Sequence, residues 1–314
     1  MINSPICKQL GIEFPIFQGG MAHISDGHLA AAVSEAGGLG IISAMNSDVE
    51  HVRNHIKTAK AKTDKPFGVN VMLMSPHADE VAKMLCEEKV PVITTGAGNP
   101  SKYIEDWNKS GIKVIPVVGS VSMARLSERA GAFAIIAEGG ESGGHVGDMT
   151  TMALVPQVCR AVSIPVIAAG GIGNGSGVAA AFMLGAVGVQ LGTRFLVAKE
   201  CNVHQNYKNK IIGASDISTI VTGKRLGHPV RSIKTPFSRN YARTEYSQIS
   251  DEELEELAVG ALRLAAVEGD EKRGCFLAGQ ISGMVEKEQT AKEIIEEIFA
   301  DAESILREAS KWVK

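Results

Sequence analysis

Short apolar runs recur at regular intervals through the first two thirds of this chain, and each one ends in small or polar residues. The eight runs occupy residues 15–18, 39–43, 67–73, 91–95, 113–118, 132–137, 165–169 and 186–191. They are rich in Val, Ile and Leu and hardly alternate with polar residues. Because strands covered on both faces have this pattern, the runs predict a buried parallel sheet.

Segments with helical periodicity separate the runs. They occupy residues 26–36, 48–62, 77–88, 101–109, 120–130, 152–162 and 175–184. Several begin with Ser or Asp, which cap helix N-termini, and Gly often follows the helix. Eight strands that alternate with helices predict a closed (β/α)8 barrel, the TIM-barrel fold. The alternative is an open doubly wound sheet, which usually has fewer strands and a glycine-rich turn after its first strand.

Two regions depart from this alternation. The connection over residues 138–151 is rich in glycine and too long for a plain turn, and residues 200–283 contain an acidic helix expected at 251–264. We therefore expect a barrel over residues 1–200, an inserted lid or substrate-binding subdomain over 201–283, and a C-terminal helix within 284–314 that packs back on the barrel. The candidate core contacts of that last helix are Ile294, Ile295, Ile298, Ile305 and Leu306.

Composition and charge argue against several classes of protein. Hydrophobic residues make up 45% of the chain, and the formal net charge of −3 gives no reason to expect nucleic acid or a membrane surface as a partner. The five cysteines are scattered without a CxxC pair, so neither a disulfide framework nor a metal site is expected. The N-terminal residues lack a signal-peptide pattern, and no apolar run approaches the ~20 residues of a membrane-spanning helix. We expect a soluble, cytoplasmic protein.

Glycine follows the seventh and eighth predicted strands. Gly170 and Gly171 come after the seventh, and Gly192 and Thr193 come after the eighth. Glycine exposes backbone N–H groups and allows a ligand to approach closely, and many barrels bind a phosphate after these two strands. Turns between strands and helices favour glycine in any case, but the pair of turns together with the Thr193 hydroxyl favours a phosphate site.

Further candidates lie at other strand ends, where barrel enzymes build their sites. They are Gly20, Met21, Asn70, Gly96 and Glu138. His145 lies in the long connection after the sixth strand, and the flanking glycines Gly143, Gly144 and Gly147 allow the loop to fold over a ligand. Histidine exchanges a proton near neutral pH, so His145 is the candidate catalytic residue. Its position alone is equally consistent with a histidine in a surface loop.

A basic stretch extends from Lys224 to Arg243 without an acidic residue before Glu245. Its members are Lys224, Arg225, Arg231, Lys234, Arg239 and Arg243. Such a local positive patch suits a phosphate group or an acidic partner protein. It is equally consistent with a solvated loop whose charge is balanced by the acidic residues 251–256.

Several stretches resemble one family of flavoproteins. They are PIFQGGMA (15–22), AGGLGII (36–42), DKPFGVNVMLMSP (64–76), VITTGAGNPSKY (92–103), VIPVV (114–118), EGGESGGHVG (138–147), PVIAAGGI (165–172), QLGTRF (190–195), GHPVR (227–231) and AGQ (278–280). The chain resembles the flavin-dependent type II enoyl-[acyl-carrier-protein] reductases and, more broadly, the nitronate monooxygenase and 2-nitropropane dioxygenase-like barrels. Within these stretches, TTGAGNPSKY (94–103) and KPFGVNVMLMSP (65–76) look like the reductase branch.

The resemblance implies FMN in the barrel and NADH or NADPH as the electron donor. It implies that Gly20 and Met21 lie along the isoalloxazine and that Asn70 bonds the flavin. The FMN phosphate is then held by Gly170, Gly171, Gly192 and Thr193. Gly96 and Glu138 complete the expected cofactor site, and His145 matches the family's active-site histidine. A monovalent cation is also expected near the site, with no ligands assigned, and His23 replaces an aromatic residue expected in the first loop.

The activity implied is the reduction of a trans-2-enoyl-acyl-carrier-protein to the acyl form by NAD(P)H in fatty acid synthesis. The basic residues Lys224, Arg225, Arg231 and Lys234 would dock the acidic carrier protein, and a homodimer is implied by the likeness alone. The first alternative is nitronate monooxygenase, which oxidises alkyl nitronates with O2 on the same fold. The second is a flavin-binding regulatory or storage protein, against which the intact His145 and phosphate glycines argue.

Overall fold

Eight parallel strands form a closed barrel in the computed structural model of the chain, which describes residues 2–45 and 47–313. The strands are β1 (Ile16–Gln18), β2 (Gly40–Ser43), β3 (Phe67–Met72), β4 (Val92–Gly96), β5 (Lys113–Val118), β6 (Ile135–Glu138), β8 (Val166–Ala169) and β9 (Gly188–Leu191). Their order in the sheet is β1-β9-β8-β6-β5-β4-β3-β2. A parallel bridge between Phe17 and Leu39 joins the first strand to the second. The predicted barrel is confirmed.

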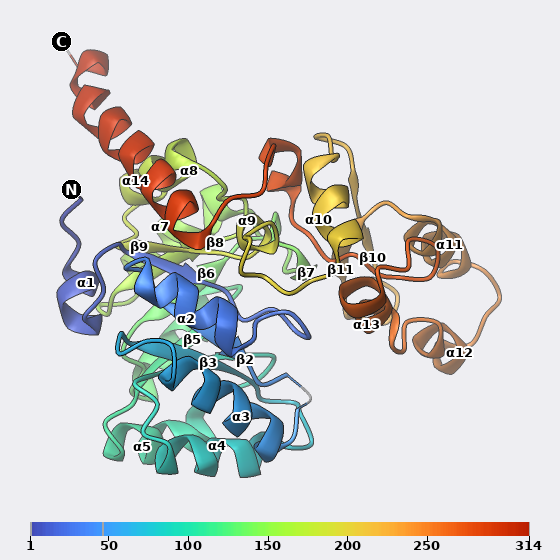
Figure 1. Cartoon of the computed structure of the whole chain (residues 1–314), viewed down its shortest axis with the longest axis horizontal. Coiled ribbons are helices and arrows are strands. Elements are labelled where there is room, and N and C mark those ends of the chain that lie inside the picture. Colours follow the sequence, from blue (N-terminus) through green and yellow to red (C-terminus); the bar gives the residue numbers. More distant parts are fainter. Residues whose placement is uncertain (1, 46, 314) are drawn as a thin grey trace.

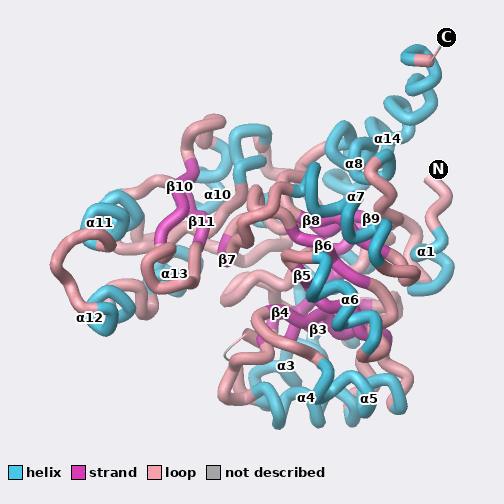
Figure 2. The backbone as a smooth tube through the Cα atoms, turned by 180° about the vertical axis from the view of Figure 1, so that it is seen from behind, coloured by secondary structure: helices cyan, strands magenta, loops and turns pink. Residues whose placement is uncertain are grey.

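Helices surround this barrel (Figures 1 and 2). They are α2 (Gly27–Glu35), α3 (Val49–Lys60), α4 (Ala78–Glu87), α5 (Ser101–Lys109), α6 (Val121–Arg129), α7 (Thr151–Ala161) and α8 (Gly175–Met183). Each begins and ends within about two residues of the predicted helix, a precision typical of helix boundaries. Side chains of Asp26, Asp48, Ser120 and Asn174 accept hydrogen bonds from first-turn N–H groups, as expected of N-caps.

Alternate residues of the strands face two separate cores. One core lies inside the barrel and includes Phe17, Ile41 and Ile136, while the other lies between the strands and the outer helices. A short helix before the first strand, α1 (Pro5–Leu10), adds Ile6 and Leu10 to the inner core. Because α1 leads directly into β1, it closes the N-terminal end of the barrel. The carboxyl ends of the strands are therefore the open end, where a site can form.

Residues 201–283, called the insertion below, form a group of elements beside the barrel (Figure 1). They include α10 (Gln205–Ile212), β10 (Thr219–Thr222), β11 (Val230–Ile233), α11 (Pro236–Thr244), α12 (Asp251–Glu256) and α13 (Ala261–Arg263). The single acidic helix predicted over 251–264 is wrong, because α12 ends at Glu256 and Gly260 adopts a left-handed conformation with φ of 72°. A π-helical turn then continues to Glu268. The two strands and α10 and α11 were not predicted.

The C-terminal helix α14 (Ala291–Glu308) begins at a capping box in which Thr290 and Glu293 bond one another's backbone N–H groups. Ile294, Ile295 and Ile298 are buried as predicted, whereas Ile305 and Leu306 are only half-buried. Figure 1 shows the reason, since the C-terminal half of the helix extends away from the barrel. In the described residues no helix is both long and apolar enough to cross a membrane.

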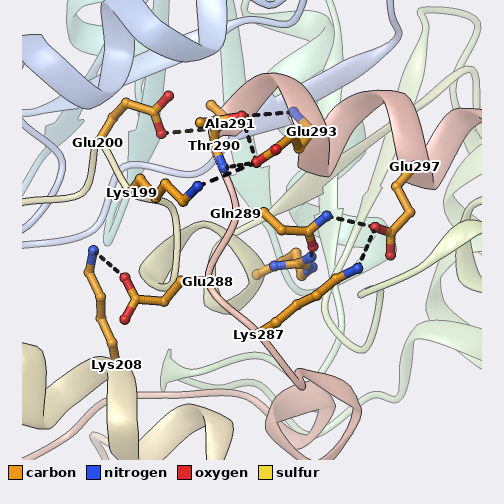
Figure 3. Close-up of polar contacts among 11 residues, drawn as sticks. Lys199, Glu200, Lys208, Lys287, Glu288, Gln289, Thr290, Ala291, Glu293 and Glu297 are labelled. Atoms are coloured by element: carbon orange, nitrogen blue, oxygen red, sulfur yellow. Dashed lines mark hydrogen bonds and ion pairs between the residues drawn. The ribbon is translucent and has the colours of Figure 1, made fainter.

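Polar contacts fasten the start of α14 to the chain that follows β9 (Figure 3). The Lys199 N–H donates to the Gln289 carbonyl over 2.8 Å, and the Ala291 N–H donates to the Glu200 carboxylate over 2.9 Å. The Gln289 amide donates to Glu297 over 2.6 Å. These contacts hold α14 against the strand that carries the predicted phosphate turn.

We predict that Thr290→Ala lowers the free energy of unfolding by about 1 kcal/mol, because it removes the cap that satisfies the first turn of α14. Urea denaturation of the purified protein measures this change. Thr58→Ala is the matched control, since Thr58 lies inside a helix and bonds only a carbonyl of its own helix. If the two variants are equally stable, the cap contributes nothing.

Candidate active site

The turns after β8 and β9 lie side by side at the open end of the barrel. Ala169 pairs with Gln190, so the residues that follow the two strands are neighbours. Gly170 and Gly171 have φ values of 87° and 70°, which L-residues rarely adopt. A Cβ at Gly170 would lie 2.5 Å from the Gly139 carbonyl oxygen. The turn after β8 thus requires glycine, and it brings backbone close to whatever lies over it.

Hydrogen-bond donors are available at these turns. Thr193 is buried, and its Oγ1 accepts from the Gly279 N–H over 2.9 Å, which leaves its own proton for another acceptor. The Gly171 N–H donates to no group in the part of the chain that the structure describes. A phosphate would satisfy both donors, as the sequence predicted for this pair of turns.

The Glu141 carboxylate lies next to Gly171 but is already paired. A Cβ at Gly171 would be 3.1 Å from the Glu141 Cβ. The carboxylate accepts from the Thr151 N–H and hydroxyl, both over 2.9 Å, at the first turn of α7. The N-terminus of α7 therefore stabilises a protein carboxylate, and the donors of the two later turns are the ones that stay available at this end of the barrel.

The first and third strands bring Gly20, Met21 and Asn70 together. A side chain at Gly20 would collide with Asn70, so the two residues touch across the open end of the barrel. The Asn70 Oδ1 accepts from the Thr94 hydroxyl over 2.9 Å, which leaves its Nδ2 as a donor. Met21 lies beside Gly192, since a Cβ there would be 3.7 Å from the Met21 Sδ. The predicted flavin residues and phosphate residues thus border one space.

Gly96 and Glu138 lie at the ends of β4 and β6. A Cβ at Gly96 would meet no atom within 4 Å, so open space lies above that strand. Burial raises the pKa of the Glu138 carboxyl to about 7, and the nearby Ser142 hydroxyl offsets only part of this shift. Glu138 is therefore protonated in a large fraction of molecules at neutral pH and offers an O–H donor.

His145 lies on a two-residue strand, β7 (Gly144–His145), in the connection after β6. It pairs with Val230 of β11, and the Val146 N–H donates to the Pro229 carbonyl over 3.0 Å. The imidazole is exposed on one side, but desolvation by the surrounding chain and the charge of His228 lower its pKa. His145 is therefore mainly neutral at pH 7, with one N–H donor and one acceptor nitrogen.

Arg231 fastens the insertion to the connection that carries His145. One of its NH groups donates to the Gly140 carbonyl over 2.9 Å, and another donates to Thr219 over 3.2 Å. The sequence assigned Arg231 to a possible docking patch for the carrier protein, and the structure shows it half-buried and engaged in these two bonds. The GHPVR stretch (227–231), which contains Arg231, was among the stretches that carry the family resemblance. It did not reveal that this segment pairs with the connection after β6.

The other predicted docking residues differ in how many bonds they form with the rest of the protein. The Arg225 guanidinium donates to the Ile249 carbonyl and pairs with Asp251, both over 2.7 Å. Lys224 and Lys234 are exposed, and the Lys234 Nζ donates to the Ile217 carbonyl over 2.6 Å. The four residues do not form one free basic face, and the carrier-protein patch stays a prediction.

His23 follows β1 in a left-handed conformation with φ of 59°. Burial and the nearby charge of Arg263 in α13 lower its pKa. It therefore lies near the insertion rather than deep in the barrel. In residues 2–45 and 47–313 no group of three His, Cys, Asp or Glu side chains is placed to hold a metal ion, and the expected monovalent cation has no assigned ligands.

Comparison with known proteins identifies the family. A sequence model of nitronate monooxygenase matches residues 3–84 and 76–301. The chain belongs to the nitronate monooxygenase family, and it is an oxidoreductase built on a TIM barrel.

Its individual relatives have different names. The structure of FabK from Thermotoga maritima is 50% identical, covers 100% of both chains and superposes with a TM-score of 0.97. A (3aS,4S,5R,7aS)-5-hydroxy-7a-methyl-1-oxo-octahydro-1H-indene-4-carboxyl-CoA dehydrogenase of Mycobacterium tuberculosis is 33% identical over 100% of this chain and 99% of its own. A probable nitronate monooxygenase of Staphylococcus aureus is 33% identical over 88% and 90%.

We predict that His228→Gln raises the pKa of His145, because it removes a positive charge that disfavours the imidazolium. The pKa stays below its usual value, since desolvation is the larger cause. Titration of the His145 ring signals by NMR measures the shift. His28→Gln is the control, because His28 is not among the charges that act on His145. An unchanged pKa in His228→Gln would contradict the assigned proximity.

Proposed function

We propose that this chain binds FMN and uses NADH or NADPH to reduce the carbon–carbon double bond of a trans-2-enoyl thioester carried by acyl carrier protein. The observation that carries the proposal is the 50% identity to FabK, a type II enoyl-acyl-carrier-protein reductase, over the full length of both chains. The mycobacterial relative is named for a carboxyl-CoA substrate, which is also a thioester.

The residues at the open end of the barrel fit FMN. Gly171 and Thr193 offer donors that are free among the described residues, and a phosphate placed over the Gly170 and Gly192 turns would accept from both. Asn70 offers its Nδ2, and Gly20, Met21 and Gly96 border the space for a ring system. When bound there, FMN would supply a group that accepts hydride from the nicotinamide and passes it to the substrate.

His145 is assigned a role as a hydrogen-bond donor. Reduction of an enoyl thioester places negative charge on the thioester oxygen, and a donor aimed at that oxygen stabilises it. A neutral imidazole supplies such an N–H, and the lowered pKa keeps His145 neutral at pH 7. The pairing of β7 with β11 fixes the backbone of His145, so the insertion positions the imidazole.

The alternative function is nitronate monooxygenase, favoured by the family match and by the staphylococcal relative. A neutral histidine also suits that reaction, in which it would act as a base. Anaerobic addition of NADH or NADPH followed by crotonyl-CoA separates the two functions. The proposed function requires that the nicotinamide bleaches the flavin and that the thioester restores its colour. Oxygen uptake with propionate-3-nitronate, and no response to the thioester, would establish the alternative.

We predict that Gly171→Ala is purified with less than a tenth of the FMN of the unaltered protein. A Cβ at this φ of 70° is strained and would press on the Glu141 side chain, so the donor turn must shift away from it. The ratio of flavin to protein absorbance measures the content. Gly111→Ala is the matched control, because Gly111 has a φ of 77° but open space around it. Equal FMN content in the two variants would refute the phosphate site.

We predict that His145→Ala lowers kcat for crotonyl-CoA by about 10² to 10³, the cost of losing one donor to a developing oxyanion. FMN content should be unchanged, because the cofactor residues lie on other strands. Stopped-flow measurement of thioester-dependent flavin re-oxidation isolates the step. His28→Ala controls for loss of an exposed histidine. Full activity in His145→Ala would remove the residue from the mechanism.

A further inference from the structure

A hollow of about 520 Å³ lies in the insertion, away from the barrel site. The end of α10, the loop over residues 213–218, the end of β11, the first half of α11 and Glu271 border it. The nitronate monooxygenase or reductase chemistry assigned above uses none of its side chains. It is large enough for a group of the size of a nucleotide.

Three cationic side chains and one acidic side chain line the hollow. Lys210 and Glu271 pair over 2.9 Å and offset one another. Lys234 donates to the Ile217 carbonyl, which fixes its ammonium group without neutralising it. Arg239 has no acidic partner anywhere in the two described ranges, 2–45 and 47–313. Two positive charges on different elements therefore face one space without a matching anion.

Neutral hydroxyl donors add to this field. Ser215 and Ser218 lie 3.1 Å apart through their hydroxyls, and both border the hollow. The C-terminus of α10 also borders the hollow and acts against the field, since Lys210 in its last turn is already paired with Glu271. The surroundings as a whole favour an anion with several acceptor oxygens.

Strand β11 connects this hollow to the barrel site. Val230, at one end of the strand, pairs with His145, and Ile233, at the other end, borders the hollow. Lys234 lies four positions after Val230, a distance of roughly 13 Å in extended chain. An anion in the hollow and a reacting group beside His145 are therefore separated by the length of an extended organic arm.

We infer that the hollow binds a phosphate ester at the far end of a ligand whose reactive end lies at the barrel site. This inference rests on the proposed function, in which two ligands have such a phosphate. One is the thioester carrier, as coenzyme A or as a phosphopantetheine arm, and the other is NADPH. Both would present phosphate oxygens to Lys234 and Arg239 while their reactive ends reach the flavin site.

The test measures binding of two phosphate probes to the full-length, flavin-containing protein by isothermal titration calorimetry. The probes are 3′,5′-ADP, which represents coenzyme A, and 2′,5′-ADP, which represents NADPH. Arg239→Gln and Lys234→Gln should each raise the Kd of the bound probe about tenfold, since each removes a charge-assisted bond. Arg243→Gln is the matched control, because Arg243 lies on the same helix but does not border the hollow.

Binding of 3′,5′-ADP alone would assign the hollow to the thioester carrier, and binding of 2′,5′-ADP alone would assign it to NADPH. Binding of both would show a shared phosphate site. The inference is overturned if neither probe binds, or if Arg239→Gln and Arg243→Gln bind the probe as tightly as the unaltered protein. Because no turnover is measured, a protein that binds a probe but reduces no enoyl thioester would refute the proposed function and leave the phosphate site in place.

Discussion

The antiparallel pairing between β7 and β11 is the interaction on which the site depends. A two-residue strand is too short to hold its own conformation, and glycines flank His145 on both sides. Its register is set by Val230 and Arg231, and the Arg231 guanidinium adds a bond to the Gly140 carbonyl. The insertion therefore fixes the backbone around His145 through strand pairing. The sequence of the insertion does not show where this pairing occurs.

The backbone of the connection after β6 also lies very close to the backbone at the end of the insertion, which constrains the open end of the barrel. A Cβ at Gly143 would lie 2.5 Å from the Ala278 carbonyl carbon, and one at Gly279 would lie 2.8 Å from the Glu141 carbonyl oxygen. Glu141 accepts from the Gln280 N–H over 3.0 Å in the same region. The connection after β6 is thus packed directly against the end of the insertion, without side chains between them. Because packed backbone has little freedom to shift, His145 and the phosphate turns are held in one fixed arrangement.

The sequence predicted the barrel well because the signal for each strand is local. A strand buried on both faces must be apolar along its length, whichever strands become its neighbours. The insertion lacks this property, since most residues of β10 and two of β11 are only half-buried and their partner β7 is distant in the chain. Helix periodicity also failed at Gly260, where the left-handed turn divides what the acidic residues suggested was one helix.

Some features of the candidate site could be predicted from the sequence and others could not. Glycines at strand ends can be recognised in a sequence as positions of unusual backbone, and Gly170 and Gly171 do adopt positive φ values of 87° and 70°. The charge of a side chain, in contrast, does not show where in the structure the residue lies. Arg231, Arg225 and Lys234 look alike in the sequence, but the first is bonded to the connection after β6, the second to Asp251 and the third lies at the hollow. Their different surroundings depend on contacts with residues that are distant in the chain, and the sequence alone does not give these contacts.

This division explains how relatives with different names share one scaffold over nearly their whole length. Gly20 and Gly170 at the open end of the barrel have no room for a Cβ without collision. The insertion presents side chains of β11 and α11, which can change without disturbing the barrel strands. One fold can carry different activities, because its scaffold and the side chains around a site vary separately. In this chain β11 joins the insertion to His145, so side chains on that strand can change the surroundings of His145 without altering the barrel.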